Sequence, residues 1–273
     1  MIQELTIESG DRVRFISDIH FGHPKSLVQN PESLRFLLEK CNYLVVCGDL
    51  SETRKSPYLA DGLEKRARFL EMCQEVGVKP ILLAGNHDPD EQVGLLKLLG
   101  GSVCALHGHA LFKVVAPWGW EYLQNKQASR KLVKAFPDAD TNLLSRLELA
   151  RAMSVLVPPV YTRSGGGGDK LLRFLAHSAW PPERPAQILL AWLTMMWRIR
   201  RFTDRFLPEA EVVVFGHLHR RGVCRYSGGR LFINLGACFH HAKCWAADLT
   251  ANGGVSIRSY VPNGFNGPKF ILR

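Results

Sequence analysis

The chain has 273 residues, of which 46% are hydrophobic and 22% charged, a balance typical of folded globular proteins. Its longest apolar run, residues 188–197, is about half of the roughly 20 residues that a membrane-spanning helix needs, which argues against a transmembrane protein. The net charge of +10 favours polyanionic partners such as nucleic acid, nucleotides or an anionic membrane surface. Much of the excess lies in residues 118–207, which hold 14 Lys and Arg against 7 Asp and Glu.

The first part of the chain predicts alternating strands and helices. Strands are expected at 12–17, 43–47 and 79–84, and helices at 31–40, 61–76 and 90–99. Asn30 is the expected N-cap of the first helix, and Gly77 follows the end of the second. This alternation implies a parallel sheet with crossover helices.

A strand at 103–106 follows, after which the pattern becomes helical. Helices are expected at 121–136, 141–157 and 186–206, and the segment 158–169, with four consecutive glycines, is expected to be a mobile loop. Strands resume at 211–215, 230–235, 243–248 and 255–260, and the tail from Pro262 is expected to be loop. We therefore predict one α/β catalytic domain, formed by residues 1–117 and 208–273, that is interrupted by a helical cap at 118–207.

The cysteine pattern predicts the cellular compartment in which the protein is found. Seven cysteines are present, an odd number, and no C-x-x-C pair occurs, so neither a disulfide framework nor a zinc ribbon is expected. The chain begins without a basic and then apolar leader segment. These features predict a reducing, cytoplasmic location, which is compatible with peripheral contact at the inner face of a membrane.

Five short motifs rich in Asp, His and Asn follow apolar runs. They are Asp18-Ile19-His20, Gly48-Asp49, Gly85-Asn86-His87-Asp88, His107-Gly108-His109 and Gly216-His217-Leu218-His219. The carboxyl ends of parallel strands meet at one edge of a sheet, so we expect these side chains to gather there. A carboxylate such as Asp49 can bridge two cations about 3.5–4 Å apart, an arrangement that activates water against phosphate esters.

At these motifs the chain resembles the calcineurin-like metallophosphoesterases, whose pattern D-x-H, G-D, G-N-H-D/E, H and G-H-x-H is present in that order. The resemblance covers about residues 12–116 and 209–250. It implies an α/β fold of the metallophosphoesterase type, a layered β-sheet sandwich flanked by helices. It also implies two ligand sets that share one carboxylate: Asp18, His20, Asp49 and His219 for one metal, and Asp49, Asn86, His107 and His217 for the other. His87 would stabilise or protonate the phosphate, and Asp88 would orient His87.

The sequence allows more than one role for several histidines. His107 is the expected middle ligand of the second metal, with His177 as the alternative. His109 either lines the site or belongs to a surface turn, and His23 is expected to face solvent. His240 and His241 are expected near the site opening. Mixed oxygen and nitrogen ligation suits Mn²⁺, our first expectation, and also Fe or Zn²⁺.

The helix expected at 186–206 ends in Arg198, Arg200, Arg201 and Arg205. One interpretation is a cap helix that packs on the core, its basic end complementing the helix dipole. The other is an interfacial element, in which Trp192, Met195, Met196 and Trp197 meet acyl chains and the arginines meet phosphates.

Differences between these motifs and those of related families narrow the range of candidate substrates. Ser/Thr protein phosphatases usually carry G-D-x-V-D-R-G and G-N-H-E, and purple acid phosphatases place a Tyr where this chain has Glu52. The layout looks most like the UDP-2,3-diacylglucosamine hydrolases, although those often have G-N-R-D and H-G-D. We predict a dinuclear-metal hydrolase acting on a phosphodiester or pyrophosphate bond, with a nucleotide- or lipid-linked compound such as UDP-diacylglucosamine as the candidate substrate. The alternative is a basic protein that binds nucleic acid or a membrane surface and has a structural or vestigial metal site.

Overall fold

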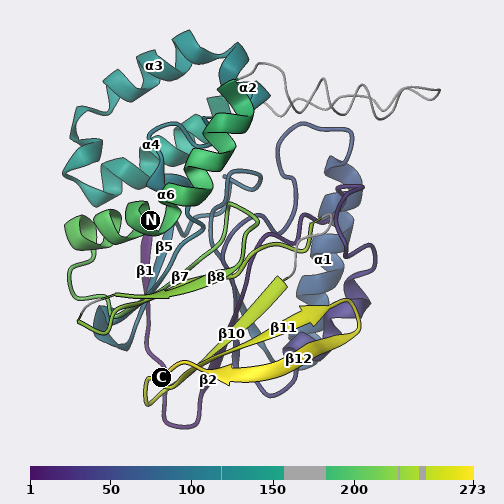
Figure 1. Ribbon diagram of the computed structural model, residues 1–273. Coiled ribbons are helices and arrows are strands. Elements are labelled where there is room, and N and C mark those ends of the chain that lie inside the picture. The colour runs from purple at the N-terminus through teal and green to yellow at the C-terminus, as the bar shows by residue number, and fades with distance from the viewer. Residues whose placement is uncertain (118, 157–182, 227, 240–243) are drawn as a thin grey trace.

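The computed structural model describes residues 1–117, 119–156, 183–226, 228–239 and 244–273 (Figure 1). Two six-stranded sheets lie face to face. The first has the order β12-β11-β10-β2-β3-β4 and the second the order β1-β5-β6-β7-β9-β8. This arrangement, with helices outside both sheets, is the predicted layered sandwich.

The first sheet contains the strands that follow one another early in the sequence. Its members are β2 (Arg12–Ile16), β3 (Tyr43–Val46), β4 (Lys79–Leu82), β10 (Cys244–Thr250), β11 (Val255–Val261) and β12 (Gly264–Ile271). The strands β2, β3 and β4 run parallel, as the alternating pattern predicted, whereas β10, β11 and β12 pair antiparallel.

The second sheet joins segments that are far apart in the sequence. Its members are β1 (Ile2–Leu5), β5 (Leu95–Leu98), β6 (Val103–Ala105), β7 (Val212–Phe215), β8 (Gly222–Arg225) and β9 (Leu231–Asn234). The chain leaves the sheet after β6 and returns in β7, which pairs parallel with β6. The helices between them thus begin and end at neighbouring strands.

The core lies between the sheets. Alternate residues of the facing strands are fully buried there, among them Val13, Phe15, Val45, Val212, Ile233 and Leu249. Because β3 and β7 are also covered on their outer faces, their sequences are nearly continuous apolar runs. This explains why these strands could be predicted from their composition. In β2, Arg14 is buried and pairs with Asp248.

Helices form the two outer layers. The 3₁₀ helix η1 (Pro31–Leu38) and α1 (Leu59–Glu75) cover the first sheet. The second is covered by α4 (Leu143–Leu156) and α6 (Glu183–Phe206). In α6 the buried apolar residues are Ala191, Met195, Ile199 and Phe202, spaced three or four apart as on one helix face. The interpretation of α6 as a helix packed on the core is therefore correct for this face.

Shorter elements complete the helical region. They are η2 (Leu99–Gly101), η3 (His109–Leu111), α2 (Trp120–Gln124), α3 (Lys126–Ala135) and η4 (Pro137–Asp140). The single helix expected at 121–136 is divided at Asn125 into α2 and α3. The glycine-rich segment at 158–169 lies outside the described residues.

Two of the predicted elements were wrong. The helix expected at 90–99 is instead the strand β5, which pairs parallel with β1 and antiparallel with β6. A short apolar run has no period long enough to separate a strand from a buried helix. The tail after Pro262 contains β12, a largely exposed edge strand held by backbone pairing with β11. The strands β1 and β8 were not predicted.

The cysteines also required a correction. Cys238 and Cys244 form a disulfide, which the odd number of cysteines did not lead us to expect. Cys41, Cys47, Cys73, Cys104 and Cys224 are free. Among the described residues, no helix combines the length and the apolar character that crossing a membrane requires.

Candidate metal centre

The predicted motifs meet at one edge of the two sheets. Each follows the carboxyl end of a strand: β2, β3 and β4 in the first sheet, and β6 and β7 in the second. Parallel pairing within each sheet places these ends together. The candidate ligands that the structure brings together are Asp18, His20, Asp49, Asn86, His107, His217 and His219.

Five of these residues have a left-handed backbone conformation. The φ angle lies between 53° and 78° at Asp18, His20, Asp49, His217 and His219. For a residue with a Cβ this conformation costs roughly 1–2 kcal/mol. Such strain is found mainly where a functional site requires it. The sharp turns after the strands direct these side chains into one shared space.

The first donor set consists of Asp18, His20 and His219. His219 Nε2 lies 3.1 Å from His20 Nε2 and 3.3 Å from Asp18 Oδ1. The Ser17 hydroxyl and the His217 amide both contact Asp18 Oδ2, which fixes the orientation of the carboxylate. Asp18 Oδ1 is buried without a hydrogen-bond partner. This oxygen faces the Nε2 atoms of His20 and His219, at 3.9 Å and 3.3 Å.

The second donor set consists of Asn86, His107 and His217. Asn86 Oδ1 lies 3.0 Å from His107 Nε2 and 2.9 Å from His217 Nδ1. On their outer sides, His107 Nδ1 is 2.8 Å from the Cys47 carbonyl and His217 Nε2 is 3.0 Å from the Val115 carbonyl. When these outer nitrogens donate to the carbonyls, the inner nitrogens keep lone pairs that can bind a metal.

Asp49 lies between the two donor sets. Its Oδ1 accepts a hydrogen bond of 2.8 Å from the His87 amide. Its Oδ2 lies 3.3 Å from His107 Nε2 and 3.9 Å from His20 Nε2. A single carboxylate oxygen therefore faces both sets, which is the position required of a bridging ligand.

The electrostatics of this centre suit cations. Burial would raise the pKa values of Asp18 and Asp49, but neighbouring histidines, His107 first among them, hold both below the usual range. Burial would lower the pKa of His107, but the fields of Asp49 and Asp18 raise it to about 10. Two buried carboxylates thus attract positive charge to this space, either as a proton on the inner nitrogen of His107 or as a metal ion that takes the place of that proton. This donor chemistry fits Mn²⁺, Fe or Zn²⁺.

Gly85 lets the backbone approach Asp49 closely. A Cβ at this position would lie 2.5 Å from the Asp49 amide nitrogen and 2.7 Å from Asp88 Oδ1. We expect Gly85→Ala to lower the free energy of unfolding by about 1–3 kcal/mol, as overpacking does, and to reduce metal content. Denaturant unfolding and metal analysis would measure both. Gly94→Ala is the matched control, because its Cβ would meet Leu147 at an ordinary 3.5 Å; equal behaviour of the two variants would contradict this expectation.

His87 is held by a carboxylate that the sequence analysis did not assign. Its Nδ1 lies 2.8 Å from Glu52 Oε2, and Arg54 Nη2 donates to the same oxygen at 3.0 Å. Burial would raise the pKa of Glu52, but hydrogen bonds from His87 and Arg54 lower it to about 2. Burial would lower the pKa of His87, but Asp49 and Glu52 outweigh it and raise the pKa. The surroundings therefore favour the protonated ring.

Asp88 has a different position from the one that the resemblance implied. Its Oδ1 accepts from the amides of Asp49 and Gly85, both at 2.9 Å, and its Oδ2 accepts from the amide of Leu50 at 2.8 Å. It thus ties the loop after β3 to the loop after β4 and does not orient His87. Adjacent residues of a turn point in different directions, so the order His-Asp in the sequence does not show which carboxylate reaches the ring.

The remaining histidines differ in their burial and in their contacts. His109 is buried, with its ring centroid 5.3 Å from that of His107, so it does not belong to a surface turn. His23 is partly buried and contacts Phe239, with ring centroids 4.8 Å apart, so it does not simply face solvent. The alternative ligand His177, and also His240 and His241, lie outside the described residues.

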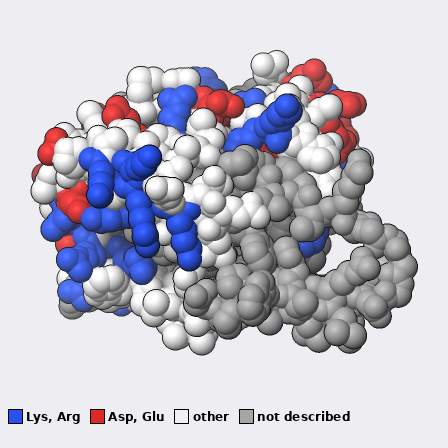
Figure 2. Space-filling model, turned by 90° about the horizontal axis from the view of Figure 1, so that it is seen from above, with Lys and Arg blue, Asp and Glu red and all other residues white. Residues whose placement is uncertain are grey.

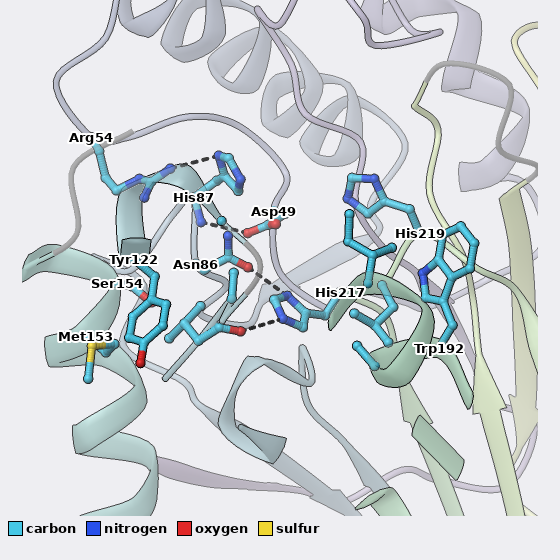
Figure 3. Close-up of a pocket in the computed structure, with 16 residues that line it drawn as sticks. Asp49, Arg54, Asn86, His87, Tyr122, Met153, Ser154, Trp192, His217 and His219 are labelled. Atoms are coloured by element: carbon cyan, nitrogen blue, oxygen red, sulfur yellow. Dashed lines mark hydrogen bonds between the residues drawn. The ribbon is translucent and has the colours of Figure 1, made fainter. Parts of the chain in front are cut away.

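A cavity of about 390 Å³ opens over the metal centre. In Figure 3, Asp49, Asn86 and His217 point toward one another, with Tyr122 and Met153 on one side and Trp192 on the other. The centre provides the polar part of the wall, and α2, α4 and α6 provide a largely apolar part. A ligand here would place a charged group at the centre and an apolar or aromatic group beneath the helices.

Comparison with known families agrees with this geometry. The model of the calcineurin-like phosphoesterases matches residues 11–221, which is most of the chain. The chain belongs to the calcineurin-like phosphoesterase family. The match includes all five motifs and spans the helical region between β6 and β7. Membership in this family, together with the clustered ligands, indicates a metal-dependent phosphoesterase.

Solved structures resemble the chain at low sequence identity. A dimetal phosphatase from Danio rerio is 12% identical, with a TM-score of 0.50, and the match covers 97% of this chain and 100% of that one. Vps29 from Entamoeba histolytica, solved with zinc, is 10% identical, with a TM-score of 0.47 and coverage of 96% and 99%. No curated protein matches the chain significantly. The similarity to the dimetal phosphatase, at 12% identity, concerns the fold alone.

Proposed function

We propose that this protein hydrolyses a phosphodiester or pyrophosphate bond with two divalent metal ions. The observation that carries the proposal is the position of Asp49 Oδ2, which faces both donor sets at once. Five strained backbone positions among the ligands support it, because a fold retains such strain where a site requires it. A purely structural site would need only one well-formed set of ligands.

In this proposal each donor set holds one ion. Asp18, His20 and His219 would bind the first; Asn86, His107 and His217 would bind the second; and Asp49 would bind both. When bound, such ions activate water and neutralise charge on a phosphoryl group, with Mn²⁺ our first expectation and Fe or Zn²⁺ also compatible. The carbonyls of Cys47 and Val115 orient the two histidines of the second set.

His87 would act on the substrate from the cavity wall. It lines the cavity beside Arg54, and its protonated form is favoured by Asp49 and Glu52. A protonated imidazole there can stabilise charge on the phosphate or give a proton to the leaving oxygen. Arg54 provides a second cationic group at the same wall. Glu52 positions His87 and does not itself line the cavity.

Removing the charge of Glu52 tests this arrangement. We expect Glu52→Gln to lower kcat about 10- to 100-fold, the usual effect of losing an outer partner, with metal content unchanged. The pKa of His87 should fall without this carboxylate, so the alkaline limb of the rate profile should move to lower pH. Rates measured against pH would show this. Glu91→Gln removes a carboxylate that pairs with Arg66 and does not line the cavity, and it serves as the control; an unshifted profile in Glu52→Gln would contradict the role.

The lining of the cavity supports a proposal for the substrate class. Its apolar wall, with Val115, Tyr122, Met153 and Trp192, would accept an apolar or aromatic group attached to the phosphate. Both a nucleotide-linked and a lipid-linked substrate, such as UDP-diacylglucosamine, have this character. Because α2, α4 and α6 contribute this wall, we propose that the helical region 118–207 selects the substrate.

A parallel assay would test the proposal. Bis-p-nitrophenyl phosphate, UDP-diacylglucosamine, cyclic nucleotides and single-stranded DNA would each be offered with Mn²⁺. We expect metal-dependent hydrolysis of the first compound and of at least one natural type. If none is hydrolysed by protein that has bound two metal ions, the proposed function is wrong.

A further inference from the structure

A second cavity, of about 530 Å³, lies beside the cavity over the metal centre. The same two elements, the segment 111–117 and α6, line both cavities. The segment 111–117 separates the two: Val115 and Ala116 line the first cavity, and Val114 and Pro117 the second. The helix α6 passes both, with Trp192 at the first and Trp197 at the second. Five residues of helix correspond to a rise of about 7.5 Å and a rotation of about 140°, so a ligand that occupies both cavities would have to bend around α6.

The second cavity has a strong positive charge. Its walls include five cationic side chains and one carboxylate, Asp140, which leaves a net charge of +4. The cations are Lys113, Arg146, Arg198, Arg201 and Arg205. Figure 2 shows Lys and Arg side chains gathered at the left of the upper face, where α3, α4 and α6 lie in Figure 1.

Three of these arginines, Arg198, Arg201 and Arg205, form no ion pair with a carboxylate among the described residues, and Arg205 donates only to the backbone carbonyl of Asp140. The nearby carboxylates are engaged elsewhere: Asp140 with Lys113 and Arg146, and Asp204 with Arg200 and Arg230. Burial lowers the pKa of Arg198, with no carboxylate offsetting it. A partly desolvated guanidinium without a counter-charge is unfavourable unless an anion binds beside it.

Aromatic rings hold Arg198 and Arg201 in place. The guanidinium of Arg198 lies 4.8 Å from the centroid of Phe112, and that of Arg201 lies 5.2 Å from that of Trp197. Arg198 Nε also donates to the Thr194 hydroxyl at 3.0 Å. Stacking fixes the plane of a guanidinium and leaves its remaining N–H groups free for phosphate. Trp197 is 52% exposed, which leaves aromatic surface for a base.

We propose that this second cavity binds the phosphate backbone of a single-stranded nucleic acid, whose neighbouring phosphate occupies the metal centre. The inference rests on the proposed function and chooses the nucleotide-linked substrate over the lipid-linked one. Cationic grooves interleaved with aromatic side chains are typical of proteins that bind single strands. The basic groups lie in a hollow, which fits a chain of separate phosphates better than the flat surface of a bilayer.

Binding without metal tests the inference apart from catalysis. The full chain, with EDTA present, would be titrated into a short fluorescein-labelled oligothymidylate, and fluorescence anisotropy recorded over a range of salt concentrations. The double substitution Arg198→Gln and Arg201→Gln should weaken binding at least 10-fold. It should also reduce the salt slope by about 1.4, because each phosphate contact on a single strand contributes about 0.7.

Arg200→Gln is the matched control. Arg200 is on the same helix but contacts Tyr226 and Asp204, away from the second cavity. It should change the dissociation constant less than twofold. Arg201→Gln alone changes an exposed side chain, so it keeps the test valid if the double variant does not fold.

Other outcomes would overturn the inference. One is that the oligonucleotide binds the double variant and the unsubstituted protein equally. Another is that Arg200→Gln weakens binding as much as the double substitution, which would indicate non-specific charge. A third is that vesicles of phosphatidylglycerol bind through Arg198 and Arg201 while the oligonucleotide does not. If oligonucleotide binding depends on these arginines but protein with two bound metal ions hydrolyses none of the four compounds, the binding role of the second cavity stands and the proposed function fails.

Discussion

Asp49→Asn should abolish both metal binding and turnover. The substitution keeps the shape of the side chain but removes the negative charge that faces both donor sets through Oδ2. Losing a residue that hydrogen-bonds to a metal ligand lowers metal affinity or activity about 10–100-fold. A ligand shared by two ions should be worth more, so we expect kcat/KM to fall by more than about 10²-fold. Metal analysis and hydrolysis of bis-p-nitrophenyl phosphate with Mn²⁺ would measure the two losses.

Asp61→Asn provides the control for this substitution. It makes the same chemical change on the surface of α1, where Asp61 pairs with Lys65 one turn away. It should retain full metal content and full rate. If Asp49→Asn retained both ions, or hydrolysed the ester at the unsubstituted rate, Asp49 would not be the shared ligand. The alternative of a basic binding protein with a vestigial site would then be favoured.

His87→Gln should separate metal binding from catalysis. His87 interacts with Glu52 and Arg54 on the cavity wall and, in our proposal, is not a ligand of either ion. We expect the variant to bind the metals normally and to lose about 10²–10⁴-fold in kcat, the usual contribution of a general acid or charge stabiliser. Metal stoichiometry and steady-state rates on the same preparation would show this.

The control here is His23→Gln, because His23 packs against Tyr58 and Phe239 and does not line the cavity. It should leave the rate within a few-fold of the unsubstituted protein. A parallel loss of metal and rate in His87→Gln would make His87 a ligand, a possibility that its position near His20 and Asp49 makes worth measuring. An unchanged rate would remove it from the mechanism.

The sequence predicted the positions of the site well, for a physical reason. The strands β3 and β7 are buried on both faces, so each is a nearly continuous apolar run whose end is visible in the sequence, and β2 ends in the apolar pair Phe15-Ile16. Polar residues directly after such runs must lie at the sheet edge. The convergence of Asp18, Asp49 and His217 could therefore be predicted before any coordinates were known.

What could not be predicted depends on tertiary contacts. β5 and β12 are strands because of their pairing partners, and neither has a periodicity that distinguishes it. At Glu52 the sequence indicates only that the tyrosine ligand of the purple acid phosphatases is absent, because the contact of Glu52 with His87 arises from the turn that follows β3. The second cavity forms where α6 passes the segment 111–117, two regions about 80 residues apart in the sequence.

The most direct test of the central claim is a crystal structure with Mn²⁺, in which anomalous scattering locates the ions. We predict two peaks, one at each donor set, about 3.5–4 Å apart and joined by Asp49 Oδ2. One peak alone, or two peaks of which Asp49 contacts only one, would contradict the shared-carboxylate centre and the hydrolytic mechanism built on it.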